Sequence, residues 1–547
     1  MQGRLWTHVT WTFATQLSLL ALACATPQLG DKDLPPRPES LRAAFEAMPE
    51  PGDARLRVLS DNVDAWVARW RLIESAQRSI DVQYFIIEPD AFGMSLLGLL
   101  AERARAGVKV RLMVDSRGTP GLTRPWLGAD WLQELKRAGA DVRVYNRIET
   151  SVAEAVASGD LRYVTASNHD KLIIVDQRLA ITGGRNIARD YLSDPRDLPT
   201  AYTDMDIFLE GNQPARALTE AFSSELRGPR VHRVDDDDGF DDLEGLLLVA
   251  QAMRTYLNDP AFTDEELRAL SGDAKRDALA LVYEGSAVAG LDHVPSDRAR
   301  ALLREVTRGM AHALRLRGAM HRPVPPITVD PTGMRVLDTH STSGPTQRNR
   351  INENLLAAVQ AAEREVIIQS PYFILTERGI RALREAAGRG VKVTILTNSP
   401  VSSDSPLTQA AFLRQWPRLL AEISTARLYV VGSGNLMHAK VGVMDGVLSF
   451  VGSYNLDPLS AGVNGEVVTS VWSDEFAARQ RALILDITER PSPQVHEYLI
   501  EKLPDGRPLL REGKAVVRFG PKDHCSPEQL KKIERLEPVL ELLAPLL

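Results

Sequence analysis

Cysteine is scarce in this sequence of 547 residues, with one copy at Cys24 and one at Cys525. Two cysteines at opposite ends of a long chain do not build a disulfide framework, so they leave the cellular compartment open. The histidines of the two motifs described below, His169 and His438, lack nearby cysteines and the i, i+4 helical spacing of zinc sites, and we expect no metal ion and no other cofactor. Basic residues are not in excess either, since 65 Lys and Arg face 72 Asp and Glu, for a formal charge of -7. Because affinity for nucleic acid comes mostly from Lys and Arg, we expect no nucleic-acid partner.

Lys, Arg and acidic residues are absent from residues 5–23, a stretch that ends in small residues just before Cys24. Its last letters, LALAC, are similar to a bacterial lipoprotein signal, so we expect residues 1–23 to be a signal peptide and Cys24 to carry lipid. An uncleaved anchor helix and plain secretion are the alternatives. The polar, Pro-rich residues 24–54 are expected to form a tether. This predicts a protein of the bacterial cell envelope that is anchored to a membrane and faces the periplasm.

One long motif occurs twice, which indicates an internal duplication. GVKVRLMVDS at residues 107–116 returns as GVKVTILTNS at residues 390–399. Each copy follows a stretch with apolar residues three and four apart, typical of a helix, and each such stretch follows one typical of a strand. Alternating strands and helices predict an α/β fold in which helices cover both faces of a sheet. We expect two such halves, related by a pseudo-twofold axis, with helix-rich sequence between them.

The most informative feature is a pattern of one His, one Lys and one Asp, written H-x-K-x4-D. It is present once in each half and comprises His169, Lys171, Asp176, His438, Lys440 and Asp445. Residues two apart on a strand point to the same face, so each half is expected to present an imidazole and an ammonium together. Both aspartates end a short apolar strand, where they are expected to hold the turn. An asparagine follows each histidine by seventeen residues, at Asn186 and Asn455.

These residues mark a resemblance to the phospholipase D superfamily, whose members carry two H-x-K-x4-D segments in two related α/β halves. Within it, SIDVQYFI, GVKVRLMVD, GGRN and TDMDIFLEG resemble the bacterial cardiolipin synthase branch, most of all the class called cardiolipin synthase C. The resemblance implies two tandem phospholipase D-like α/β/α sandwich domains, with the active site at their interface. The implied divisions are a first domain at residues 55–211, a helix-rich insertion at 212–332, a second domain at 333–500 and a C-terminal extension at 501–547.

The resemblance also implies a metal-independent reaction on a phosphodiester. His169 is expected to attack phosphorus and form a phosphohistidine, while His438 gives a proton to the leaving alcohol. The two lysines and two asparagines would stabilise charge on the phosphoryl oxygens. The carboxylates of Asp206 and Glu466 would accept a hydrogen bond from the far nitrogen of each ring, with Asp204 as a competitor of Asp206.

The same residues serve several reactions, and the sequence leaves three of them open. The first is phosphatidyl transfer that makes cardiolipin from phosphatidylglycerol, with phosphatidylethanolamine as a second candidate donor. Hydrolysis of phospholipid head groups to phosphatidic acid is the second, and cleavage of another phosphodiester, nucleic acid included, is the third. Intact motifs in both halves disfavour a scaffold protein without activity. The expected partners are therefore phospholipids and a membrane, and the sequence does not define the oligomeric state.

Two further segments bear on the choice of substrate. Residues 116–131 follow the first repeated strand, and Leu122, Trp126 and Leu127 within them are expected either to line an entrance for acyl chains or to pack in the core. The second segment departs from the family pattern. Leu459 precedes Ser460 where many relatives carry an arginine, so a cation for a second phosphate or head group is missing there.

Overall fold

The computed structural model describes most of the chain between residues 33 and 540. The described residues are 33–124, 129–147, 151, 166–234, 242–258, 269–289, 291–325, 327, 332–340, 349–432, 435–489, 494–538 and 540. The expected signal peptide with Cys24, and the side chains of Trp126 and Leu127, lie outside these residues. No helix among the described ranges combines the length and the apolar content needed to cross a bilayer.

The chain divides into two compact units, which are described one at a time. The N-terminal unit comprises residues 53–147 and 170–331. The C-terminal unit comprises residues 1–52, 148–169 and 332–547. The division passes between His169 and Asp170, so the first H-x-K-x4-D segment contributes its histidine to one unit and its lysine to the other.

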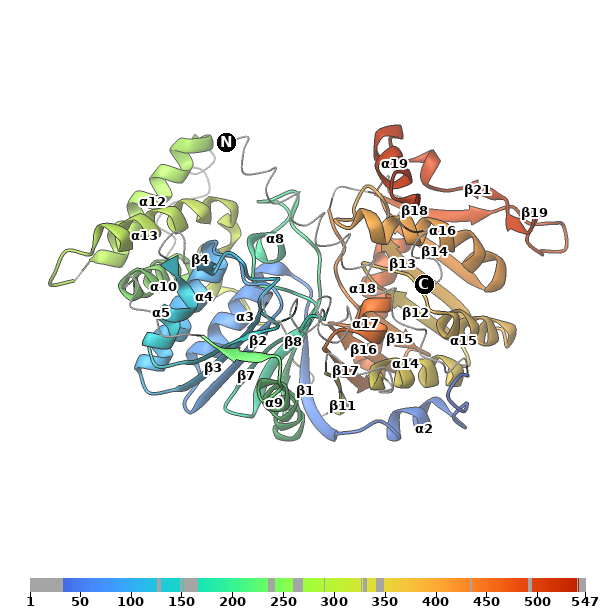
Figure 1. Cartoon of the computed structure of the whole chain (residues 1–547), viewed down its shortest axis with the longest axis horizontal. Helices are drawn as coiled ribbons and strands as arrows, with labels where there is room; N and C mark the ends of the chain where they lie inside the picture. Colours follow the sequence, from blue (N-terminus) through green and yellow to red (C-terminus); the bar gives the residue numbers. More distant parts are fainter. Residues whose placement is uncertain are drawn as a thin grey trace. The chain divides into compact units, whose positions relative to one another are not determined.

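The N-terminal unit is built around a mixed sheet (Figure 1). From edge to edge its strands are β1 (Pro51–Leu59), β9 (Asp206–Glu210), β8 (Leu179–Gly183), β7 (Lys171–Val175), β2 (Ser79–Tyr84), β3 (Lys109–Asp115), β6 (Asp141–Tyr145) and β10 (Val231–Arg233). The pairs β2–β3 and β3–β6 are parallel and the others are antiparallel. A short hairpin joins β4 (Thr123–Arg124) to β5 (Ala129–Asp130) outside this sheet.

Helices cover both faces of this sheet. α3 (Asn62–Glu74) and α4 (Ala91–Arg105) share one hydrophobic core with the apolar side chains of β2 and β3. α9 (Asn212–Leu226) lies on the other face, where the guanidinium of Arg111 in β3 is 4.9 Å from the ring centre of Phe222. Because successive side chains of a strand point to opposite faces, β3 can serve both layers. The expected helix–sheet–helix layering is therefore confirmed in this unit.

The remaining helices of the N-terminal unit extend the core beyond the sheet. They are α5 (Trp131–Arg137), α8 (Arg189–Leu192), α10 (Leu243–Asn258), α12 (Gly272–Val288), α13 (Asp297–Gly309) and the short 3-10 helices η2 (Met310–His312), η3 (Leu314–Leu316) and η4 (Ala319–His321). α10 packs against α4, and a side chain at Gly98 of α4 would come within 2.1 Å of the Leu246 carbonyl oxygen. Glycine is therefore required where these two helices meet.

The C-terminal unit repeats the same sheet. Its strands, in spatial order, are β11 (Thr332–Thr339), β17 (Glu466–Trp472), β16 (Leu448–Gly452), β15 (Val441–Met444), β12 (Glu365–Gln369), β13 (Lys392–Asn398), β14 (Ala426–Val431) and β18 (Val495–Ile500). Each strand has a counterpart at the same place in the other sheet, with the same parallel and antiparallel pairings. The duplication inferred from the repeated motifs is thus a duplication of the whole sheet.

Helices also cover both faces of the second sheet (Figure 1). α14 (Arg350–Ala361) and α15 (Glu377–Gly388) share its main core, whereas α18 (Asp474–Glu489) contacts β15, β16 and β17 without joining that core. The other elements are α2 (Leu41–Glu46), α16 (Pro406–Glu422), α17 (Pro458–Gly462), β19 (Leu510–Arg511), β20 (Lys514–Ala515), β21 (Val517–Phe519), η5 (Pro521–Asp523) and α19 (Pro527–Glu534). β21 pairs with β18, and α19 packs on α16, so the end of the described chain is part of this unit.

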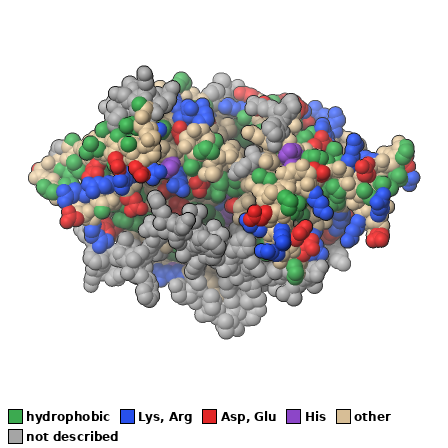
Figure 2. Space-filling model, turned by 90° about the horizontal axis from the view of Figure 1, so that it is seen from above, with side chains coloured by type: hydrophobic (Ala, Val, Ile, Leu, Met, Phe, Trp, Pro, Cys, Tyr) green, Lys and Arg blue, Asp and Glu red, His purple; other side chains and the backbone are tan. Residues whose placement is uncertain are grey.

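Charged side chains of both signs cover the described surface. Figure 2 shows basic and acidic groups interspersed on one face. On α12 and α13, for example, Arg304 lies 3.1 Å from Glu284, and Arg308 is paired with Asp277. Such exposed pairs contribute on the order of 0–1 kcal/mol each to the free energy of unfolding, so they add little to the stability of the fold.

Candidate active site

His169 lies beside the first residues of strand β17 in the C-terminal unit. Its backbone N–H donates to the Gly465 carbonyl at 2.9 Å, and the Gly465 N–H donates to the Ser167 carbonyl at 2.9 Å. These bonds form a short parallel bridge between Asn168 and Gly465. The bridge brings the imidazole next to Glu466, the residue with which β17 begins.

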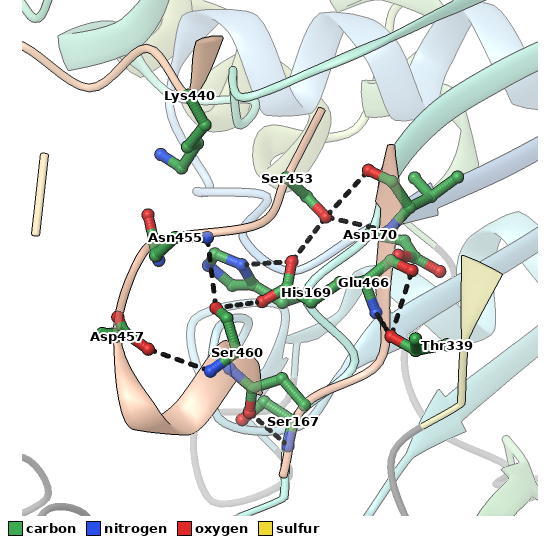
Figure 3. A network of polar contacts seen from close by, with 12 residues as sticks. Ser167, His169, Asp170, Thr339, Lys440, Ser453, Asn455, Asp457, Ser460 and Glu466 are labelled. Carbon is green, nitrogen blue, oxygen red and sulfur yellow. Dashed lines mark hydrogen bonds and ion pairs between the residues drawn. The ribbon is translucent and has the colours of Figure 1, made fainter. Parts of the chain in front are cut away.

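The Glu466 carboxylate is the centre of a buried polar network (Figure 3). Its Oε2 lies 3.1 Å from His169 Nδ1 and accepts a hydrogen bond from Ser453 Oγ at 2.5 Å. Its Oε1 accepts from Ser460 Oγ at 2.6 Å. A carboxylate can only accept, so Nδ1 of His169 carries the proton and its Nε2 carries the lone pair. The three donors compensate the cost of burying the charge, and they fix the tautomer of the imidazole.

Both serines are themselves held by backbone contacts. Ser453 directly follows the end of β16, and its Oγ accepts a hydrogen bond from the Val467 N–H at 3.1 Å. Ser460 lies in the short helix α17, whose N-cap Asp457 accepts from the Ser460 N–H at 2.9 Å. Burial, with a further contribution from Glu466, raises the pKa of Asp457 to about 6. Sequence analysis missed both serines, because nothing in their spacing signals a shared acceptor.

His438 and Lys440 lie together, as the strand alternation predicts. Lys440 Nζ is 2.9 Å from Nδ1 and 3.0 Å from Nε2 of His438, and it donates to the His438 carbonyl at 2.5 Å. Both side chains are buried. The arrangement places a positive charge directly beside the second imidazole, where a phosphoryl oxygen of a bound substrate would gain from it.

Asn398, at the end of β13, fastens the backbone that leads into His438. Its side-chain Nδ2 donates to the Met437 carbonyl at 2.8 Å and to the Pro371 carbonyl at 3.1 Å, and its Oδ1 accepts from the Met437 N–H at 3.1 Å. Sequence analysis missed Asn398. A signal was present, because the ninth residue of the repeated motif is polar in both copies, at Asp115 and Asn398.

Asp176 and Asp445 hold turns, as expected. Asp176 accepts hydrogen bonds from three successive backbone N–H groups, at residues 77–79, at 2.7–2.9 Å. Asp445 does the same with residues 363–365, at 2.8–2.9 Å. Both have positive φ angles, 55° and 52°, in the hairpins that follow β7 and β15. Their contacts tie each motif strand to the neighbouring antiparallel strand, β2 or β12, and assign them a structural role.

Lys171 and Asn186 lie in the N-terminal unit, both buried. Lys171 begins β7, and its Nζ is 5.5 Å from the ring centre of Phe85. Asn186 Oδ1 accepts from the Ile86 N–H at 3.2 Å, which fixes the loop after β2. Asn455, the counterpart of Asn186, is buried in the C-terminal unit. Among the described residues its side-chain oxygen has no hydrogen-bond partner.

The strand registers identify the residue that corresponds to Glu466 in the first sheet. Asp206 pairs with Gly183, whereas Val468 pairs with Gly452, and both glycines follow their histidine by fourteen residues. Asp206 therefore corresponds to Val468, and the residue two earlier, Asp204, corresponds to Glu466. This corrects the expectation that Asp206 is the counterpart of Glu466, in favour of its competitor.

The Asp206 carboxylate is occupied by two buried arginines. Arg69 Nη2 lies 2.9 Å from Oδ2, and Arg185 Nη1 lies 2.6 Å from the same oxygen. Burial alone would lower the pKa of Arg69, but Asp206 and Tyr84 raise it above its ordinary value. Asp206 is therefore committed to an ion-pair network that joins α3 to the end of β8.

The carboxylate of Asp204, the counterpart of Glu466, occupies space that is open because residue 184 is a glycine. A side chain at Gly184 would come within 2.3 Å of Asp204 Oδ1. Gly184 follows His169 by fifteen residues, as Ser453 follows His438. The second sheet thus combines the longer Glu466 with a serine, and the first combines the shorter Asp204 with a glycine.

The remaining sequence expectations concern two leucines. Leu122 is fully buried in the core of the N-terminal unit, so it packs inside the protein and does not line an entrance. Leu459 is half-buried against Ala166 and Val463. The position at which the family resemblance led us to expect an arginine therefore makes an apolar contact in this protein.

Comparison with known proteins agrees with this architecture. A family model described as cardiolipin synthase, PLD-like domain, matches residues 70–225 and 355–485, just over half of the chain. Cardiolipin synthase C of Escherichia coli (strain K12) is 26% identical over 445 residues, covering 78% of this chain and 83% of that protein. The probable cardiolipin synthase YwiE of Bacillus subtilis (strain 168) is 22% identical over 415 residues, covering 76% of this chain and 62% of that protein.

A solved structure shares the fold. The phosphatidylserine synthase of Haemophilus influenzae Rd KW20 superposes with a TM-score of 0.54 at 14% identity, and the match covers 93% of this chain and 100% of that chain. The family model matches the inner strands of both copies of the duplicated sheet, and it includes the two histidines and Glu466. This chain therefore belongs to the phospholipase D superfamily, in the family of cardiolipin synthase-like enzymes that share the PLD-like domain.

Proposed function

We propose that this protein transfers phosphatidyl groups between phospholipids and makes cardiolipin from phosphatidylglycerol. The observation that carries the proposal is the contact between His169 Nδ1 and the buried carboxylate of Glu466 at 3.1 Å. A carboxylate at one ring nitrogen makes the other nitrogen a nucleophile, and it stabilises the positive charge that the ring acquires when it attacks. The cardiolipin synthases among its relatives support the choice of lipid.

The first half of the reaction forms a phosphohistidine. Nε2 of His169 attacks the phosphorus of the donor lipid, an N–P bond forms, and the P–O bond to the head group breaks. His438 gives its proton to the leaving oxygen, so the head group departs as a neutral alcohol. Lys440, which adjoins His438, would stabilise the charge on the phosphoryl oxygens, and Asn455 would do so through its side-chain NH2 group.

The second half reverses these steps with a different alcohol. His438 removes the proton from the head-group hydroxyl of a second phosphatidylglycerol, whose oxygen attacks phosphorus. The N–P bond breaks and His169 returns to its neutral state. Cardiolipin and the released glycerol are the products. Lys171 and Asn186 are proposed to serve the first copy of the motif as their counterparts Lys440 and Asn455 serve the second. Glu466 serves His169, and Asp204 is proposed as the counterpart of Glu466.

Hydrolysis is the second candidate, and one observation favours it. Leu459 makes an apolar contact where the family resemblance leads us to expect an arginine, so this side chain offers no cation to the phosphate of an acceptor lipid. If water enters in place of the lipid alcohol, the same residues produce phosphatidic acid. The two candidates differ only in the second alcohol.

One experiment separates the candidates. Purified full-length protein is incubated with phosphatidylglycerol vesicles, with and without phosphatidylethanolamine, and the products are identified by mass spectrometry. Cardiolipin from the wild type, and none from His169→Ala or His438→Ala, is the expected result. Phosphatidic acid alone would establish hydrolysis, and unchanged lipids combined with cleavage of DNA would overturn both candidates.

The expected location is tested separately. We propose a lipoprotein of the cell envelope, anchored through Cys24, because its sequence context is similar to a lipoprotein signal. Growth with a labelled fatty acid should label the wild type and leave Cys24→Ser unlabelled. Equal labelling of both would contradict the anchor.

A further inference from the structure

A tyrosine lies beside His438 and is hydrogen-bonded to an aspartate, and neither residue has a part in the chemistry described above. The ring of Tyr372 meets the imidazole of His438 edge to face, with 6.5 Å between the ring centres. The Tyr372 hydroxyl donates to Asp404 Oδ1 at 2.7 Å. All three residues belong to the C-terminal unit.

One side chain fixes the three segments that carry these residues. Asn398 holds the carbonyl of Pro371 before Tyr372, the backbone of Met437 before His438, and the hydroxyl of Ser402 at 3.1 Å in the loop that reaches Asp404. A fully buried amide with four such contacts leaves these segments little freedom to move apart. The cluster of Tyr372, Asp404 and His438 is therefore preorganised.

Asp404 is suited to receive a ligand. Its side chain is exposed, yet it lies deep among protein atoms, and this burial raises the pKa of its carboxyl despite the hydrogen bond from Tyr372 and the charge of Lys440. Among the described residues, Tyr372 provides the one side-chain hydrogen bond found to Asp404, and this bond uses Oδ1. An exposed carboxylate oxygen at a crowded place is an acceptor for a cationic or hydroxylated group.

The proposed chemistry places a specific group there. His438 protonates the leaving oxygen, so the head group of the donor lipid departs beside His438. An ethanolamine head group carries an ammonium two carbons from that oxygen. We propose that Asp404 and Tyr372 form the subsite for the departing head group, and that the Asp404 carboxylate binds the ammonium of ethanolamine.

The subsite deepens the proposed function and rests on it. Lys440 offsets the repulsion between Asp404 and the lipid phosphate, because its ammonium acts on both. A glycerol head group would bind the same carboxylate through its hydroxyls, without the attraction between opposite charges. Asp404 therefore favours phosphatidylethanolamine over phosphatidylglycerol as the donor.

The test compares two donors. Full-length wild type, Asp404→Asn and Tyr372→Phe are incubated with vesicles that contain either phosphatidylethanolamine or phosphatidylglycerol as the donor, and released ethanolamine or glycerol is quantified. Asp404→Asn should lower kcat/KM for phosphatidylethanolamine about 10- to 100-fold and change that for phosphatidylglycerol less than about 3-fold, because the amide keeps hydrogen bonding and loses the charge. Tyr372→Phe should shift selectivity in the same direction by a smaller factor. Asp474→Asn, on an exposed aspartate of the same unit, is the matched control.

The outcomes are distinguishable. Equal losses with both donors, or no loss with either, would overturn the subsite and leave the transferase intact. Release of glycerol without ethanolamine by the wild type would also overturn it. A wild type that is inactive on both lipids, like His438→Ala, would overturn the proposed function and the subsite with it. Thermal unfolding of each variant shows whether a loss reflects misfolding.

Discussion

Replacing Glu466 by glutamine tests the buried network most directly. The amide keeps the size of the side chain and can still accept from His169 and Ser453 through its oxygen, while its NH2 group faces Ser460. The charge is lost, and with it the stabilisation of the imidazolium that forms during attack. Removal of the carboxylate charge in comparable His–carboxylate pairs costs about 10⁴ in rate, and we expect kcat to fall about 10²- to 10⁴-fold.

The effect on stability should be much smaller. Three hydrogen bonds to a carboxylate become bonds to a neutral amide, which weakens each by about 1 kcal/mol. Against this, the cost of burying a charge at Glu466 disappears, and this cost is several kcal/mol. The two contributions oppose each other, so we expect the free energy of unfolding to change by less than about 2 kcal/mol.

The assay is the conversion of phosphatidylglycerol in vesicles, followed as cardiolipin and phosphatidic acid together, with urea unfolding in parallel. Glu497→Gln is the matched control, since Glu497 is paired with Arg427 at the surface of the same unit. A Glu466→Gln variant with kcat within about 3-fold of the wild type would refute the assigned role of the carboxylate. A variant that unfolds at much lower urea would show that the network mainly stabilises the fold.

Three other predictions concern stability. Asp445→Ala removes the acceptor of three backbone N–H groups and should lower the free energy of unfolding by about 2–4 kcal/mol in urea denaturation, whereas an unchanged midpoint would contradict the turn-holding role. Arg69→Met leaves the buried Asp206 with one guanidinium fewer and should lower the free energy of unfolding by about 3–5 kcal/mol. The double variant Arg69→Met/Asp206→Leu should recover part of this loss, and no recovery would refute the pairing. Burial, with a contribution from His496, lowers the pKa of His524 to about 4, so the unfolded chain binds the extra proton between pH 6.5 and 4 and stability falls as pH drops through this window. Because His524 is only half-buried, its contribution should be about 1–2 kcal/mol, and His524→Asn should reduce the stability difference between pH 7 and pH 4.5 by this amount in denaturation curves; a difference as large as in the wild type would contradict the assignment.

Much of the fold follows from the repeats in the sequence. The second copy of GVKVRLMVDS predicted a second sheet, and the eight matched strands of each sheet do occur in the same order. The apolar strand and helix patterns and the hairpin signal at Asp445 were sufficient for this, because they are local properties of the chain. The proximity of Lys440 and His438 could also be predicted from the sequence, since both residues lie on one short segment.

The network around Glu466 could not be predicted in this way. Ser453 and Ser460 meet the carboxylate because a β-strand end and a short helix converge there, and this convergence depends on tertiary packing. The sequence also could not decide whether Asp204 or Asp206 corresponds to Glu466, for a different reason. Side chains on a strand repeat every two residues, so a shift of two keeps the same face and leaves the apolar pattern unchanged. Only the pairing with Gly183 resolves it.

The place where the chain passes from one unit to the other has a consequence for fragments of this protein. His169 is encoded in the first half of the gene and Glu466 in the second, although both belong to the C-terminal unit. A protein cut between residues 258 and 332 would therefore separate the nucleophile from the carboxylate that orients it. Each half on its own should be inert, and activity should return only when the two polypeptides are produced together and reassemble.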